Sequence, residues 1–217
     1  DPDTGKPAPV AWRQADFPIA YSIQRQGPSE LPEGAHVAVI QDAFLTWEKA
    51  SGASVRFQFD GLSDTPALAM DGSNTIHFSA DSDDFNAPST VATTSFFAEF
   101  PSFAETTARL VEADIIINDA HGFSINDPPL AFLFDLQAVV THEIGHLLGF
   151  DHSPVDGPTE SPARATMITF LRRGQADERT LAPDDLAGLT VVYRAEVAAA
   201  ERGRIEGRIT DAAGRGL

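Results

Sequence analysis

One segment of eleven residues constrains this chain most, because it can bring three histidines to a single point. Residues 142–152 have the sequence His-Glu-Ile-Gly-His-Leu-Leu-Gly-Phe-Asp-His and contain three of the six histidines. On an α-helix, residues four apart project from one face about 6 Å apart, so His142 and His146 can reach one ion. Gly149 favours a left-handed turn that ends the helix and returns His152 toward the same point. The spacing therefore predicts a helix, a sharp turn and a metal site.

The residue types favour a catalytic zinc ion over a structural one. Three neutral imidazole nitrogens leave one tetrahedral position for water, whereas a structural zinc site is closed by a fourth protein ligand. Glu143, next to the first ligand, could accept a proton from that water and return it to a leaving amine. We therefore predict a hydrolase with His142, His146 and His152 as zinc ligands and Glu143 as general base. Two alternatives stay open: a non-catalytic zinc-binding or adhesion module, and a metal-dependent hydrolase of non-peptide substrates.

Composition excludes several other classes of function. The chain has 217 residues, with 32 acidic and 15 basic side chains and a net charge of -17. Nucleic-acid binding requires clustered Lys and Arg, so we expect no nucleic-acid partner. The absence of cysteine excludes disulfides, thiol nucleophiles and cysteine zinc sites. No apolar run approaches the roughly 20 residues that span a bilayer, so we expect no membrane insertion, and we expect a monomer.

Periodicity along the chain predicts an α+β fold. We expect strands over residues 18–23, 55–59, 75–78, 91–97 and 113–118, and helices over residues 35–50, 132–148 and 182–193. These elements predict a twisted, mixed sheet of about five strands with two long helices and a short C-terminal helix. Residues 1–11 are predicted to form an extended arm, residues 12–195 the main domain, and residues 196–217 a linker or the truncated start of a β-sandwich module.

Residues around the motif also carry a family resemblance. Ser153 follows the third histidine, and Met167 lies in Ala165-Thr166-Met167-Ile168. With the motif, these residues resemble the matrixins, the metzincin metallopeptidases that include matrix metalloproteinases and bacterial relatives, and the likeness is to the bacterial type. The resemblance covers roughly residues 12–195 and implies a secreted zinc-dependent endopeptidase that acts on proteins or peptides. It also implies that Met167 packs beneath the three imidazoles, and that Val91, Ala92 and Thr93 lie on the edge strand that pairs with extended substrate.

Two departures from the family pattern lead to further expectations. Thr93 stands near the position where vertebrate-type matrixins have a histidine ligand of a second, structural zinc, so we expect that zinc to be absent. His36, His77 and His121 are then expected to be isolated surface or packing residues. Residues 168–171, Ile-Thr-Phe-Leu, replace the usual aromatic and proline residues, so the resemblance does not predict the shape of the primed-side pocket or the cleavage preference. The acidic loops at residues 60–71 and 81–84 could bind calcium through carboxylate and carbonyl oxygens, or be solvated turns.

Overall fold

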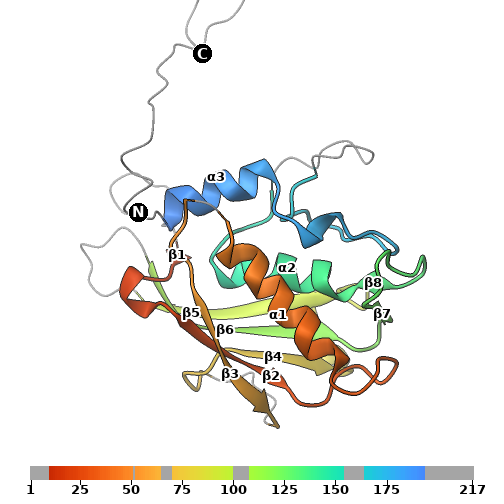
Figure 1. Ribbon diagram of the computed structural model, residues 1–217. Coiled ribbons are helices and arrows are strands. Elements are labelled where there is room, and N and C mark those ends of the chain that lie inside the picture. Colours follow the sequence, from red (N-terminus) through yellow and green to blue (C-terminus); the bar gives the residue numbers. More distant parts are fainter. Residues whose placement is uncertain (1–9, 51, 65–69, 100–107, 154–163, 194–217) are drawn as a thin grey trace, which may run out of the picture.

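A mixed β-sheet and three α-helices make up the computed structural model, which describes residues 10–50, 52–64, 70–99, 108–153 and 164–193 (Figure 1). The main sheet contains β1 (Val10–Ala11), β2 (Ile19–Gln24), β3 (Phe57–Ser63), β4 (Thr75–Ser79), β5 (Ala92–Glu99) and β6 (Ala108–Asn118), and a small second sheet contains β7 (Phe123–Ser124) and β8 (Phe134–Asp135). The α-helices are α1 (Ala35–Glu48), α2 (Leu136–Leu147) and α3 (Pro183–Val192). Short 3-10 helices span η1 (Gln14–Asp16), η2 (Ser82–Asp84) and η3 (Asp177–Arg179). The predicted α+β class is confirmed.

The order of strands leaves β5 at one edge of the sheet. Strands β3, β2, β4 and β6 are parallel neighbours in that order, and the two-residue β1 pairs with the start of β6. Strand β5 runs antiparallel to β6, from the pair Ala92 and Ile117 to the pair Glu99 and Arg109. Among the described strands β5 pairs with β6 alone, so its outer backbone groups have no strand partner.

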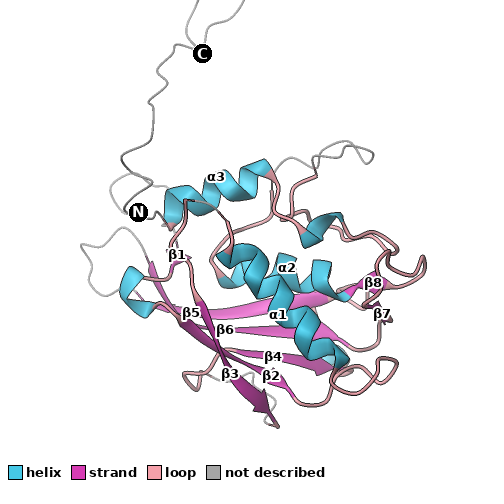
Figure 2. Cartoon of the chain, viewed as in Figure 1, coloured by secondary structure: helices cyan, strands magenta, loops and turns pink. Residues whose placement is uncertain are grey.

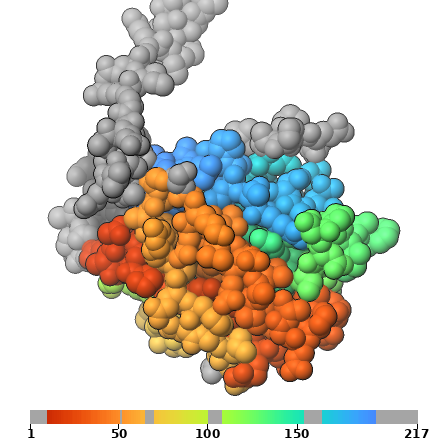
Figure 3. Space-filling model, in the orientation of Figure 1, coloured from red at the N-terminus to blue at the C-terminus, as the bar shows by residue number. Residues whose placement is uncertain are grey.

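Helices α1 and α2 pack on one side of the sheet and enclose the core with it, and α3 lies on the same side, farther from the strands (Figure 2). Helix α1 forms much of the surface in Figure 3, next to side chains of β3. Its inner face buries Ile40, Phe44 and Trp47 completely or almost so, and the ring of Phe44 stacks on Tyr21 of β2. Trp47 also donates a hydrogen bond of 2.8 Å from Nε1 to the carbonyl oxygen of Thr141 in α2. Helix α1 thus supports the middle of α2, where the motif begins.

Several element boundaries differ from those expected. Strand β3 continues through Asp60 to Ser63 by pairing with β2, so Asp60 is a strand residue rather than part of an acidic loop. Strand β6 begins at residue 108 instead of 113, because the long edge strand β5 pairs with its first half. Helix α2 begins at residue 136 instead of 132, since Phe134 and Asp135 pair with β7. Within the described residues, no helix has the length and apolar character needed to cross a bilayer.

Candidate metal centre

Helix α2 is fixed at its start by a buried carboxylate. The side chain of Asp135 accepts a hydrogen bond of 2.9 Å from the backbone N–H of Ala138, which caps the helix. The guanidinium of Arg179 in η3 donates two hydrogen bonds to the same carboxylate, of 2.9 and 2.6 Å. This pairing raises the pKa of Arg179, chiefly through its hydrogen bond to Asp135. Asp135 therefore caps the first turn of α2, and Arg179 neutralises the charge of its carboxylate.

The end of α2 forms the turn that the sequence predicts at Gly149. Gly149 has φ of +87°, and its N–H donates to His146 O at 2.8 Å while the N–H of Phe150 donates to Gly145 O at 2.9 Å. These two bonds form a Schellman motif, which needs a left-handed residue at this position. A Cβ atom on Gly149 would also collide with the carbonyl oxygen of Val10 in β1. Glycine is thus required both by the turn and by the close approach of β1.

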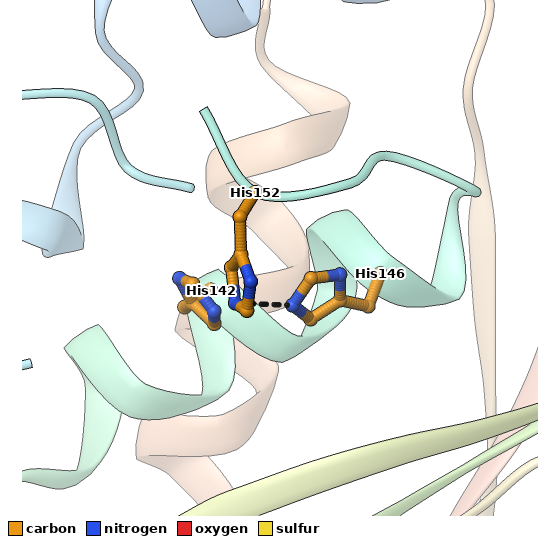
Figure 4. Close-up of side chains that lie close together, drawn as sticks. All are labelled: His142, His146 and His152. Atoms are coloured by element: carbon orange, nitrogen blue, oxygen red, sulfur yellow. Dashed lines mark hydrogen bonds between the residues drawn. The ribbon is translucent and has the colours of Figure 1, made fainter. Parts of the chain in front are cut away.

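The three motif histidines converge after this turn (Figure 4). His142 and His146 rise from α2, His152 comes from the segment beyond it, and one ligand nitrogen from each ring lies within 4.8 Å of the others. The Nε2 atoms of His146 and His152 are 3.3 Å apart. Two nitrogens bound to one tetrahedral zinc at 2.0–2.1 Å would be about 3.3–3.4 Å apart. The spacing of this pair therefore fits zinc.

Hydrogen bonds orient the two helix-borne rings for metal binding. The Nδ1 of His142 lies 2.8 Å from Thr166 O, and the Nδ1 of His146 lies 2.7 Å from Phe150 O. A carbonyl oxygen can only accept, so each Nδ1 carries the proton and each Nε2 keeps its lone pair for a metal. Burial lowers the pKa of His142 to about 4 and also lowers the pKa of His146. Both rings are therefore neutral near pH 7, as metal ligation requires.

Met167 lies against the helix, in the segment that supports His142. Its side chain is buried, and a Cβ atom on Gly145 would collide with its sulfur. The segment is held by Asp185 of α3, whose Oδ2 accepts 2.9 Å hydrogen bonds from the N–H groups of Thr166 and Ala182. The N–H of Ser153 also donates to Met167 O at 2.6 Å. The Met167 segment thus contacts both sides of the metal site.

The carboxylate of Glu143 is buried next to the triad and contacts strand β5. Only 4% of Glu143 is exposed, and Thr94 Oγ1 donates a hydrogen bond of 2.7 Å to its Oε2. Burial raises the pKa of Glu143, while the nearby His146 and the Thr94 hydrogen bond act in the opposite direction. Burial therefore makes this carboxylate a stronger base than one exposed to water, which favours its acceptance of a proton.

A cleft of about 460 Å³ runs between β5 and the triad. Its walls include the predicted edge-strand residues Val91, Ala92 and Thr93, together with Phe134 and residues 169–171. Val91 lies just before β5, and its carbonyl oxygen accepts a 2.9 Å hydrogen bond from the N–H of Asn118. The three catalytic-motif histidines and Glu143 also line the cleft. Seven of the eight predicted site residues thus line one cleft. The eighth, Met167, does not line it and lies against Gly145 of α2.

The remaining histidines lie apart from this centre. His36 is buried against Phe78, with its Nε2 2.9 Å from Gln24 O. His77 is buried in β4, and His121 lies with its Nε2 3.1 Å from Thr90 O. In the part of the chain that the structure describes, the triad is the one group of three or more histidine or acidic residues close enough to share an ion. The acidic segments show no such group there, residues 65–69 lie outside the described ranges, and calcium stays a prediction.

Sequence reasoning missed four residues that support the site: Gly145, Thr94, Asp185 and Arg179. Gly145 left a signal, because a glycine inside a helix costs about 1 kcal/mol relative to alanine and so needs a packing reason. Met167 supplies that reason. The other three residues act through contacts between distant segments, which no local pattern in the sequence reveals.

The comparison with protein families agrees with this geometry. The matrixin family model matches residues 11–194. The chain belongs to the matrixin family. None of the curated proteins that were compared matches this matrixin. The matrixins are zinc-dependent metallopeptidases, and the histidine triad of this matrixin has the donor atoms, tautomers and spacing to bind zinc.

Proposed function

We propose that this matrixin is an endopeptidase that hydrolyses extended protein substrates, with zinc held by His142, His146 and His152. The observation that carries the proposal is the position of the Glu143 carboxylate, buried beside the triad and lining the cleft under β5. A purely structural zinc site has no use for an uncoordinated carboxylate next to its ligands. This position supports a hydrolase over a non-catalytic zinc-binding or adhesion module.

The residues of the site would divide the chemistry of peptide hydrolysis among them. Zinc held by the triad would polarise the scissile carbonyl group and lower the pKa of a water molecule. Glu143 would accept the proton of the attacking water and pass it to the nitrogen of the leaving amine. The Nδ1 hydrogen bonds of His142 and His146 would keep their Nε2 atoms aimed at one point throughout.

The unpaired edge of β5 supports peptides as the substrate class. Among the described strands, the outer backbone groups of β5 have no strand partner, and they flank the cleft along Ala92, Thr93 and Thr94. An extended peptide could add to this edge as a further strand, so that its main chain is held by hydrogen bonds whatever its sequence. Small non-peptide substrates would make no use of such an edge.

We also propose that the enzyme acts outside the cell, where an open peptidase cleft does not endanger the proteins of the cell that makes it. Detection of the enzyme in the culture medium of its source would test this.

The test combines metal analysis with a general-base variant. Purified protein should contain about one zinc per chain and should degrade an unfolded protein, with activity lost on chelation and restored by zinc. The Glu143→Ala variant should keep its zinc and lose activity by at least about 100-fold, the lower end for removal of a general acid–base group. Glu143→Gln, which preserves the size of the side chain, serves as the matched control and should be equally inactive. Proteolysis by either variant at the wild-type rate would refute the proposal.

A further inference from the structure

A threonine hydroxyl joins the edge strand to the Glu143 carboxylate. Thr94 lies in β5, where it pairs with Ile115 of β6. Its Oγ1 is 2.7 Å from Glu143 Oε2 and 3.1 Å from the backbone carbonyl oxygen of Glu143. A hydroxyl has one hydrogen to donate, and the shorter contact leads to the charged oxygen. The hydroxyl therefore donates to the carboxylate, although the carbonyl oxygen lies within reach.

This hydrogen bond is of a strong type in a place where water competes little. Hydrogen bonds from a hydroxyl to a carboxylate are short and about twice as strong as neutral ones. Glu143 is 4% exposed, and a low local dielectric strengthens such a bond further. Among the described residues, Thr94 makes the one side-chain hydrogen bond to this carboxylate. Without it, no side-chain hydrogen bond from the described residues would fix how the carboxyl group is turned.

We propose that Thr94 is a positioning residue for Glu143. Its hydroxyl holds Oε2, so that the other carboxylate oxygen is presented for proton transfer, and it does so from the strand that borders the substrate cleft. Alignment of the general base and the position of the substrate-binding edge are thereby linked through one side chain. This inference rests on the proposed function, in which Glu143 is the general base.

The kinetic test compares Thr94→Val with Thr94→Ser. Valine keeps the branched shape of threonine without its hydroxyl, whereas serine keeps the hydroxyl without the methyl group. Thr94→Val should lower kcat by about 10-fold with little change in KM, because one hydrogen bond to a charged group is lost while the strand is unchanged. Thr94→Ser should keep most of the wild-type kcat, because serine retains the hydroxyl. A packing role predicts the reverse order, so a Thr94→Val variant with wild-type kcat, or a Thr94→Ser variant as slow as Thr94→Val, would overturn the proposal.

A second measurement needs neither zinc nor turnover. In zinc-free protein labelled with ¹³C at the glutamate carboxyl carbons, the Glu143 resonance can be assigned by its absence from Glu143→Gln. That resonance should move in Thr94→Val and stay near its wild-type position in Thr94→Ser. An unmoved resonance in Thr94→Val would also overturn the proposal. Failure of the proposed function would appear elsewhere, as activity that survives Glu143→Ala, so the two failures are distinguishable.

Discussion

His142 and His146 belong to helix α2, whereas His152 belongs to the segment that follows it. The helix-borne rings are buried or half-buried, and each donates from Nδ1 to a backbone carbonyl. The ring of His152 is exposed, and among the described residues it contacts the rings of His142 and His146. Its backbone is nevertheless anchored, because Ser153 N–H bonds Met167 O. The protein thus orients the rings of His142 and His146 by hydrogen bonds before metal binds. The position of His152 is set by its backbone, and the metal would fix the orientation of its ring.

The largest expected effect separates metal binding from folding. His142→Ala and His152→Ala should each weaken zinc binding by more than about 100-fold, beyond the effect of losing an outer partner. Only His142→Ala should also destabilise the zinc-free protein, by about 1–3 kcal/mol, because Thr166 O is left buried without its donor. Zinc titration with a competing dye and urea unfolding would measure the two effects. Equal destabilisation by His152→Ala would break the comparison.

The next prediction concerns the ion pair at the start of α2, the helix that carries His142 and His146. Arg179→Ala should cost about 3–5 kcal/mol of unfolding free energy, because it leaves the buried Asp135 carboxylate without its counter-charge. Arg25→Ala removes a matched pair with Asp64 that is exposed on the surface, and should change stability little. Urea unfolding of both variants gives the contrast. Similar values for the two would show that the Asp135 cap does not depend on Arg179.

A glycine substitution tests the delivery of the third ligand. Gly149→Ala should destabilise the protein by about 2–4 kcal/mol, the combined effect of a left-handed alanine and a collision with Val10 O. Gly34→Ala is the control, since Gly34 also has a positive φ but has open space around its Cβ position. It should cost only about 1–2 kcal/mol. We also expect Gly149→Ala to weaken zinc binding while Gly34→Ala does not; unchanged zinc affinity in Gly149→Ala would contradict this.

The pH dependence of the zinc-free protein gives a further contrast. Burial lowers the pKa of folded His142 to about 4 from the ordinary value of 6.5. As pH falls from about 6.5 to about 4, the unfolded chain therefore binds a proton that the folded chain does not, and stability falls. The loss attributable to this ring is up to about 3 kcal/mol. Urea unfolding at pH 7.5 and pH 4.5 should show a larger drop for wild type than for His142→Asn, and equal drops would contradict the assigned cause.

The sequence alone was sufficient wherever the structure depends on neighbours along the chain. The four-residue spacing of His142 and His146 and the turn at Gly149 are local features, and both appear as predicted. Contacts between distant segments could not be foreseen: Thr94 meets Glu143 across 49 residues and Arg179 meets Asp135 across 44. Strand ends follow the same rule, because β3 and β6 extend as far as their partners allow. The predictions for Met167 and the edge strand came from the family resemblance, because residue spacing alone assigned no role to them.

The carbonyl groups at the end of α2 have consequences for how the domain is completed. Trp12 Nε1 donates to Leu147 O at 2.8 Å, and Tyr193 Oη donates to Leu148 O at 2.5 Å and accepts from the N–H of Trp12 at 3.2 Å. Residues near the two ends of the described chain thus meet at one helix terminus. During synthesis, the carbonyl oxygen of Leu148 at the end of α2 would lack its hydrogen-bond donor until Tyr193 has been made. A ribosome-bound fragment that ends before α3 should therefore hold an unfinished, proteolytically sensitive site.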